Sequence, residues 1–182
     1  MTKRMSRKIW IILAIVVVAV GATVGVTLSH SPASPESPSE FTLPVITWNE
    51  TSLSTLKGTP VVLNFWSISC PACRQQLHYL EAIAQQGGEE IRVIAANIAD
   101  NAANIRNFFQ DYQPTMTIAL DKNGEAYVNY CMEYENAGYV PFTLFIDSEG
   151  VVQYAKIGAF ASEAALWDSL SDILGVTAPE TS

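Results

Sequence analysis

Continuously apolar runs alternate along this chain with stretches in which apolar residues recur at helical spacing. Short apolar runs are typical of strands buried on both faces of a sheet. They predict strands at residues 61–66, 91–98 and 116–120. Two further runs, 142–146 and 151–157, flank the turn-forming sequence Asp147-Ser148-Glu149-Gly150 and therefore predict a hairpin. Residues 41–48 predict a weaker extended segment, and residues 53–58 a short turn.

Apolar residues spaced three and four apart predict the helices. The first covers residues 71–86, ends at Gly87-Gly88, and has an apolar face of Leu77, Leu80, Ile83 and Ala84. Asp100 can cap a second helix, whose apolar face is Ile105, Phe108, Phe109 and Tyr112. Two more are predicted at residues 125–130 and 162–174, the last with a face of Leu166, Leu170, Ile173 and Leu174. Strands that alternate with helices in this way predict an α/β domain with helices on the faces of a central sheet.

The first forty residues have a different composition. Residues 9–28 are 20 uncharged, mostly apolar residues, and a cluster of cations precedes them: Lys3, Arg4, Arg7 and Lys8. A helix of that length spans a bilayer core, and its cationic end stays in the cytoplasm. We therefore expect a cytoplasmic basic segment at residues 1–8, a single transmembrane anchor at residues 9–28, and an extracytoplasmic remainder at the cell membrane. A cleaved secretory signal is the alternative, since Ala19 and Gly21 are small enough for a cleavage site.

Residues 29–40 contain three prolines among serines and predict a linker that holds the domain away from the membrane. The folded domain is then expected at residues 41–175, with a flexible tail at residues 176–182. Beyond the anchor, six Lys and Arg face 18 Asp and Glu, a formal charge of −12. Such a charge excludes nucleic acid as a partner, and it would favour a basic client protein.

A pair of cysteines, Cys70-Pro71-Ala72-Cys73, directly follows the apolar run at residues 61–66. The pair falls where a predicted strand leads into a helix, and the unpaired N–H groups and positive dipole of a helix N-terminus favour a thiolate. Cys70, nearer solvent, is the expected nucleophile, and Cys73, one turn further, is the expected resolving thiol. Pro71 suits the first helical position because its missing N–H is not needed there. A redox-active disulfide of this kind needs no metal and no cofactor.

Other chemistries compete for the same two thiols. A structural zinc site needs two further ligands, and the chain offers Cys131, His30 and His78. A purely structural disulfide is also possible, although so small a ring removes little chain entropy. A copper-handling protein would bring a suitably placed His or Met. A thiol peroxidase would have a proline at Leu63, and it would also need an arginine beside the thiolate.

Three segments carry a family resemblance: Leu63-Asn64-Phe65-Trp66, the cysteine pair after it, and Val140-Pro141 before the apolar run at 142–146. Together they resemble the membrane-tethered, extracytoplasmic thioredoxin-like proteins of the TlpA/ResA/CcmG type, over about residues 41–175. The resemblance implies a thioredoxin-like fold, a central mixed sheet flanked by helices, with an inserted βα element at residues 91–120. It also implies a thiol:disulfide oxidoreductase that takes electrons from a membrane thiol carrier and reduces client protein disulfides, for example in cytochrome c maturation. A disulfide oxidase on the same fold remains the alternative, because Pro71 and Ala72 add no charge that would fix the direction.

The resemblance also assigns roles to single residues. It implies a cis bond between Val140 and Pro141 that positions a client chain beside Cys70. Trp66, Pro71 and Ala72 belong to the architecture of the site, and Ser69 stands where the family usually has tryptophan.

Proton handling is where the chain departs from the family. Asn64 and Gln76 are amides at positions where relatives use carboxylates, and an amide cannot exchange a proton near neutral pH. Glu133 and Glu135 are candidates for a replacement proton relay, and mere solvation is the alternative for both. Cys131 is either a small buried apolar residue, a regulatory thiol, or a partner for Cys70 in a resting disulfide.

Overall fold

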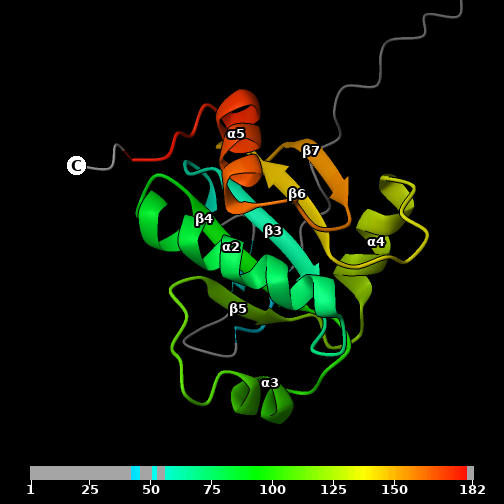
Figure 1. The fold of residues 1–182 in the computed structure, drawn as a ribbon. Helices are drawn as coiled ribbons and strands as arrows, with labels where there is room; N and C mark the ends of the chain where they lie inside the picture. The colour runs from blue at the N-terminus through cyan, green and yellow to red at the C-terminus, as the bar shows by residue number, and fades with distance from the viewer. Residues whose placement is uncertain (1–41, 46–50, 53–55, 180–182) are drawn as a thin grey trace, which may run out of the picture. The chain divides into compact units, whose positions relative to one another are not determined.

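The computed structural model describes residues 42–45, 51–52 and 56–179. The predicted basic segment, transmembrane anchor and linker lie outside the described residues. In the part that is described, no helix is long and apolar enough to cross a membrane. The element labels are those of Figure 1.

A five-stranded mixed sheet forms the centre of the fold, in the order β5-β4-β3-β6-β7. Three parallel strands make one half: β3 (Val61–Trp66), β4 (Arg92–Asn97) and β5 (Thr117–Leu120). The other half is the hairpin of β6 (Phe142–Ile146) and β7 (Val152–Ile157), and β6 pairs antiparallel with β3. The predicted strands and the hairpin are confirmed. β3 lies in the middle, and all six of its residues are buried, as its apolar run predicts.

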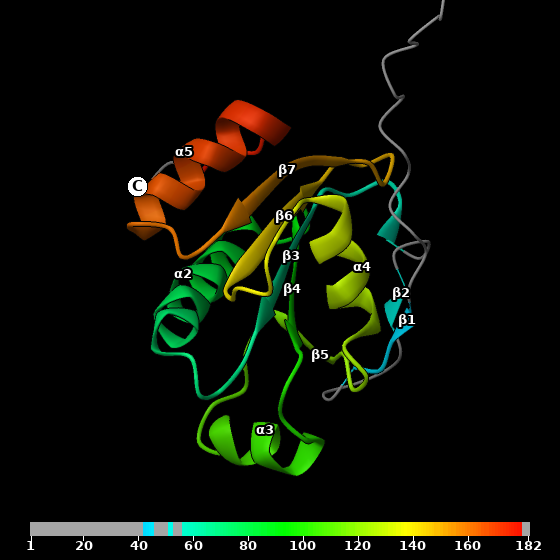
Figure 2. The ribbon, with the colours of Figure 1, turned by 90° about the vertical axis from the view of Figure 1, so that its right-hand side faces the viewer.

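Helices cover both faces of this sheet (Figures 1 and 2). On one face lie α2 (Pro71–Gly87) and α5 (Glu163–Leu174), and on the other lies α4 (Glu125–Glu133). The short helix α3 (Ala102–Phe108) connects β4 to β5. A separate two-stranded sheet, β1 (Thr42–Leu43) with β2 (Thr51–Ser52), lies on the same side as α4 in Figure 2. Residues 91–120, predicted to hold an inserted βα element, form β4, α3 and the edge strand β5.

The alternation of side chains along β3 divides the core into two clusters. Val61, Leu63 and Phe65 pack in the cluster that contains the α4 residues. Val62 and Trp66 pack in the other cluster, with the buried residues of α2 and α5. Asn64 has the same parity as Val62 and Trp66. A polar side chain is therefore placed on the face of the sheet that α2 covers.

The second predicted helix is wrong in two respects. Its N-cap is Asn101, whose side chain accepts a hydrogen bond from the N–H of Asn104 at 2.9 Å, and not Asp100. The Asp100 carboxylate instead accepts a bond from the N–H of Ile68. The helix also ends at Phe108, so Tyr112 lies in the following loop.

The other helices differ from prediction only at their ends. α2 and α5 match the predicted helices closely, and Ser162 caps α5 by accepting from the N–H of Ala165. Gly88 ends α2 with a φ of 52°, a conformation that glycine adopts without strain. α4 continues to Glu133, three residues beyond its predicted end. Val176 is buried against the core, so packing extends past residue 175.

Candidate active site

The cysteine pair lies at the N-terminus of α2, directly after the central strand. Cys70 is the N-cap, Pro71 takes the first helical position, and the two sulfurs form a disulfide. The backbone N–H of Cys73 donates to the Sγ of Cys70 at 3.1 Å. Cys73 is fully buried, whereas Cys70 is partly exposed. The geometry thus gives Cys70 both solvent access and a donor that stabilises its thiolate.

The loop before β6 brings Val140 and Pro141 against this disulfide. The bond between them is cis, as the resemblance implies. The carbonyl oxygen of Val140 lies 3.7 Å from the Sγ of Cys70, and the carbonyl of Pro141 accepts from the N–H of Gly158 at 2.8 Å. A backbone carbonyl is therefore in contact with the more exposed sulfur, where an extended polypeptide would also have to lie to react with it.

Two polar residues that sequence reasoning missed hold that loop in place. The side-chain oxygen of Asn136 accepts from the N–H groups of Gly138 and Tyr139, and its amide donates to the carbonyl of Tyr139. The hydroxyl of Tyr127 donates to the same carbonyl at 3.2 Å. These bonds fix the backbone immediately before Val140. An Asn two residues before a Gly is an ordinary turn pattern, and it could have pointed to this loop.

A fully buried network joins Asn64 to Gln76, which lies three residues after Cys73 on α2, through a third residue, Thr143. The amide of Asn64 donates to the hydroxyl oxygen of Thr143 at 2.9 Å, and the amide of Gln76 donates to the same oxygen at 3.4 Å. The side-chain oxygen of Gln76 accepts from the N–H of Phe160 at 2.9 Å. Both amides and the hydroxyl are neutral near pH 7, so this network contains no proton-accepting carboxylate. Asn64 and Thr143 are the polar residues of otherwise apolar strands, and the structure pairs them in register. A polar residue within each apolar run was the sequence pattern that could have pointed to this network.

Aromatic rings surround the strand that leads into the pair. Trp66 is fully buried, and its ring centre lies 5.5 Å from that of Phe108 and 5.9 Å from that of Phe109. Trp66 therefore packs behind the start of α2 and cannot touch a reacting group in solvent. Pro71, Ala72 and Ser69 are exposed around the disulfide and leave it open to large partners.

The remaining candidates lie on α4 and in the loop after it. Glu133 and Glu135 are exposed, and the hydrogen bonds described for Cys70 and Cys73 involve neither carboxylate. Cys131 is a buried free thiol and not a partner of Cys70 in this structure. Burial raises the pKa of the Cys131 thiol, and bonds with Tyr127 and Gly138 offset this only in part. Within residues 42–45, 51–52 and 56–179, no cluster of three or more His, Cys, Asp or Glu could hold a metal ion.

Comparison with known proteins agrees with this arrangement. A model of the AhpC/TSA family matches residues 36–155. The chain is similar to the thioredoxin-like protein YneN of Bacillus subtilis, at 29% identity over 127 residues, which cover 68% of this chain and 71% of YneN. It is also similar to the thiol-disulfide oxidoreductase ResA of Geobacillus kaustophilus, at 25% identity over 159 residues, 84% of this chain and 87% of ResA.

Solved structures share the fold. StoA from Bacillus subtilis matches with a TM-score of 0.58 at 22% identity, covering 71% of this chain and 94% of StoA. A thiol:disulfide interchange protein of the thioredoxin family from Chlorobium tepidum matches with a TM-score of 0.68 at 18% identity, covering 79% and 99%. The predicted thioredoxin-like fold is therefore confirmed.

Proposed function

Because this chain belongs to the AhpC/TSA family, we propose that Cys70 attacks disulfides of client proteins and that Cys73 resolves the product. Its relatives include proteins named thiol-disulfide oxidoreductases and thiol:disulfide interchange proteins, and the chain is an enzyme of that type. Its redox-active group is the cysteine pair itself, without an external cofactor.

The reaction takes place in two exchange steps. In the reduced protein, the Cys70 thiolate attacks one sulfur of the client disulfide, forms a mixed disulfide, and releases the other client sulfur as a thiolate. The Cys73 thiolate then attacks the Sγ of Cys70, which forms the Cys70–Cys73 disulfide and releases the second client sulfur. Two electrons pass from the dithiol to the client, and the two thiol protons end on the client sulfurs. Val140 and Pro141 position the client backbone beside Cys70.

One observation carries this assignment of roles. The Sγ of Cys70 accepts the N–H of Cys73 at 3.1 Å at the N-terminus of a helix, and only Cys70 of the two reaches solvent. A hydrogen bond and the helix dipole both favour the thiolate form of a sulfur so placed. Cys73 lacks access from solvent, so its accessible target is the sulfur beside it.

The proton on Cys73 must leave before the second step. Asn64 and Gln76 cannot accept it, so we assign its removal to water or to one of two exposed glutamates, Glu133 at the end of α4 or Glu135 just after it. Glu133→Gln and Glu135→Gln separate these cases. If both variants keep wild-type exchange rates across the pH range, neither glutamate is the relay and water takes the proton.

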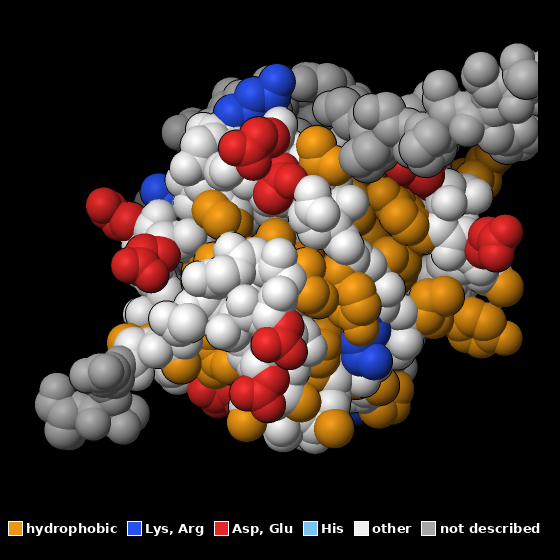
Figure 3. Space-filling view, turned by 90° about the horizontal axis from the view of Figure 1, so that it is seen from above, with side chains coloured by type: hydrophobic (Ala, Val, Ile, Leu, Met, Phe, Trp, Pro, Cys, Tyr) orange, Lys and Arg blue, Asp and Glu red, His pale blue; other side chains and the backbone are white. Residues whose placement is uncertain are grey.

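The cellular setting belongs to the same proposal. We place the enzyme at the cell membrane, with residues 9–28 as anchor, the domain outside, and electrons supplied by a membrane thiol carrier to reduce clients such as apocytochrome c. Support comes from the uncharged segment behind four cations and from the family resemblance. Acidic side chains are scattered over the face seen in Figure 3 and form no single patch, which suits a solvated domain. A membrane-impermeant maleimide applied to intact, reduced cells should label Cys70, and absence of labelling would contradict the outside location.

Trapping tests the roles of the two cysteines. Cys73→Ser should accumulate a mixed disulfide between Cys70 and a client, since the resolving thiol is gone, whereas Cys70→Ser should form none. A trapped adduct in Cys70→Ser alone would reverse the roles. The equilibrium potential of the pair tests the direction: a value near that of thioredoxin, about −270 mV, supports a reductase, and one near −120 mV, roughly that of a strong oxidant, supports an oxidase.

A further inference from the structure

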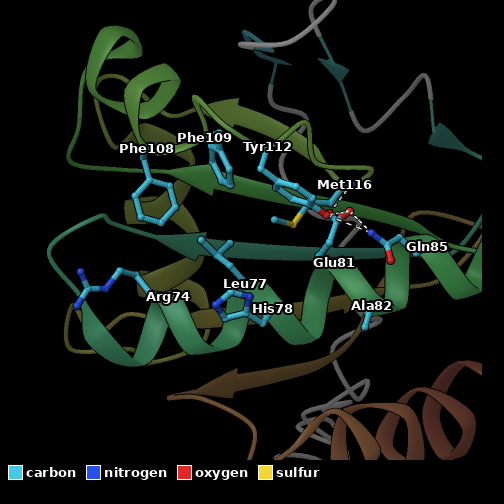
Figure 4. Close-up of a pocket in the computed structure, with 10 residues that line it drawn as sticks. All are labelled: Arg74, Leu77, His78, Glu81, Ala82, Gln85, Phe108, Phe109, Tyr112 and Met116. Atoms are coloured by element: carbon cyan, nitrogen blue, oxygen red, sulfur yellow. Dashed lines mark hydrogen bonds between the residues drawn. The ribbon is translucent and has the colours of Figure 1, made fainter.

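A groove runs along α2, starting one residue after the cysteine pair. Its volume is about 730 Å³, and its lining is mostly apolar. Arg74, His78 and Ala82 line it from α2, and Phe108 and Tyr112 face them from the other side (Figure 4). From Arg74 to Gln85 the helix rises about 16 Å, enough for an extended segment of about five residues.

The aromatic wall of the groove is built on the active-site strand. Phe108 and Phe109 pack against each other with ring centres 4.9 Å apart, and both pack on Trp66 at the end of β3. Phe108 nevertheless leaves 38% of its surface exposed, and Tyr112 leaves 46%. The wall is therefore anchored to the strand that leads into the cysteine pair, while its apolar surface faces solvent.

Glu81 ties the two walls of the groove together. Its carboxylate accepts bonds from the hydroxyl of Tyr112 at 2.6 Å and from the N–H groups of Thr115 at 2.8 Å and Met116 at 3.2 Å. Gln85 also donates to it at 2.9 Å. Three of these donors share one carboxylate oxygen, and the bonds from the loop residues tie α2 to the loop between α3 and β5. The groove is thus already formed before anything binds.

The end of the groove beside the cysteine pair carries a positive charge, that of Arg74. Arg74 is exposed and directly follows Cys73, and its backbone N–H donates to the carbonyl of Cys70 at 3.2 Å. His78 lies one helical turn further along the same wall. The chain as a whole is acidic, with a formal charge of −8. A local cation at this end favours an acidic group close to the reacting sulfur, independently of the long-range field.

We propose that this α2–α3 groove binds an apolar segment of the client polypeptide, with an acidic residue of the client beside its cysteine. The proposal rests on the proposed function, since the occupant must reach Cys70. Continuity with the cysteine pair and the placement of Arg74 identify a client chain as the occupant. The groove would select among clients, whereas the dithiol alone reacts with any accessible disulfide.

Synthetic peptides test the groove directly on the full-length protein. Each peptide carries one cysteine in a mixed disulfide with 2-mercaptoethanol and a Glu beside that cysteine. A run of Leu and Phe precedes the cysteine in one version and follows it in the other. Matched peptides replace the apolar run with Ser, or the Glu with Lys. The reduced wild-type protein should react about tenfold faster with the apolar peptide than with its serine counterpart, the scale expected for burying one apolar side chain. Arg74→Glu should reverse the preference between Glu and Lys peptides.

A variant that fills the groove supplies the matched comparison. Ala82→Phe places a ring in the groove and should bring the ratio of apolar to serine peptide rates close to one. Ala164→Phe adds the same ring at an exposed position of α5 and should keep the wild-type ratio. Circular dichroism checks that both variants fold. If Ala82→Phe does not fold, the comparison of apolar and serine peptides on the wild-type protein still tests the groove.

A small neutral substrate separates this proposal from the proposed function. If wild-type protein does not reduce hydroxyethyl disulfide, the proposed function fails. If it does, but apolar and serine peptides react equally fast, or the preference survives in Ala82→Phe, the groove proposal fails alone. A concentration-dependent dimer in light scattering that Ala82→Phe abolishes would assign the groove to a second copy of the chain and overturn the client assignment.

Discussion

The carboxylate of Asp100 accepts a hydrogen bond from the backbone N–H of Ile68 at 2.8 Å and so joins the loop after β4 to the loop before the cysteine pair. The same oxygen accepts from the amide of Asn97 at 2.9 Å. The oxygen of Asn97 in turn accepts from the N–H groups of Ala99 and Asp100. The loop from which the helix of Cys70 begins is thus held in place by Asp100, in the loop after β4.

Removing that carboxylate should loosen the approach to the helix. Asp100→Ala should lower the free energy of unfolding by about 1–3 kcal/mol, because a partly buried N–H loses a charged acceptor. It should also slow the reduction of hydroxyethyl disulfide. Urea denaturation and turnover measure the two effects. Asn101→Ala is the control, since it removes only the cap of α3; if its turnover falls as much as that of Asp100→Ala, the Ile68 bond has no special role.

Thr143 is the bridge between the two buried amides. Thr143→Val keeps the shape but leaves the amides of Asn64 and Gln76 without their shared acceptor, so the free energy of unfolding should fall by about 2 kcal/mol. Thr143→Ser keeps the hydroxyl and should lose only about 1 kcal/mol for the missing methyl group. Equal stability of the valine variant and wild type in urea denaturation would show that the network contributes nothing.

Asn64→Asp should convert the neutral network into one that titrates. Burial raises the pKa of a carboxyl above its ordinary value of about 3.9. The new carboxyl is therefore neutral at low pH, where the variant keeps its stability. The free energy of unfolding then falls as the pH rises through the raised pKa. The release of a mixed disulfide by Cys73 should gain an ionisation in its pH profile, since a carboxylate can take the thiol proton. Unfolding and stopped-flow release are measured from pH 4 to about pH 9. Identical pH profiles for variant and wild type would mean that position 64 is not desolvated.

Stability should depend on pH through Glu81. Burial raises the pKa of this carboxyl, but bonds from Tyr112, Thr115, Met116 and Gln85 outweigh it and hold the pKa below 4.5. The pKa of this carboxyl is lower in the folded protein than in the unfolded chain. The stabilisation is therefore complete above the pKa of the unfolded chain and is lost as the pH falls through the pKa of the folded protein. Glu81→Gln should be less stable than wild type by about 2 kcal/mol at pH 7, and the difference should shrink in acid. A difference that stays constant down to about pH 3 would contradict this account.

Cys131 should be unreactive in the native protein. It is buried, and burial raises the pKa of its thiol, so little thiolate is present at neutral pH. A chromogenic disulfide reagent should find no thiol in the oxidised native protein and one after unfolding in urea. Peptide mapping without reduction should find the Cys70–Cys73 pair alone; a Cys70–Cys131 peptide would support the resting-disulfide alternative.

The sequence predicts those features that depend on neighbours in the chain. The apolar runs of β3 and β6 identify strands of a sheet because both strands are buried along their whole length. The position of Cys70 at a helix start follows from the adjacent apolar run and from Pro71. These parts of the fold and of the site need no knowledge of distant residues.

The predictions are wrong where a residue far away in the sequence determines the local structure. Asp100 and Asn101 are equally good caps by residue type, and the N–H of Ile68, 32 positions away, takes Asp100. Tyr112 continues the apolar spacing of the predicted helix, but Glu81 holds its hydroxyl and keeps it in the loop. Thr143 joins Asn64 across 79 positions, which only the register of β3 and β6 reveals.

The unequal burial of the two sulfurs limits how the oxidised protein can be modified. An incoming thiol, whether from glutathione, a reducing drug or another enzyme, meets only Cys70, so each such reagent forms its mixed disulfide at that sulfur and releases the Cys73 thiolate. Double adducts are ruled out while the helix stays folded. In the reduced protein an electrophile likewise meets only the Cys70 thiolate, so its stoichiometry in intact-mass spectra would count working sites directly.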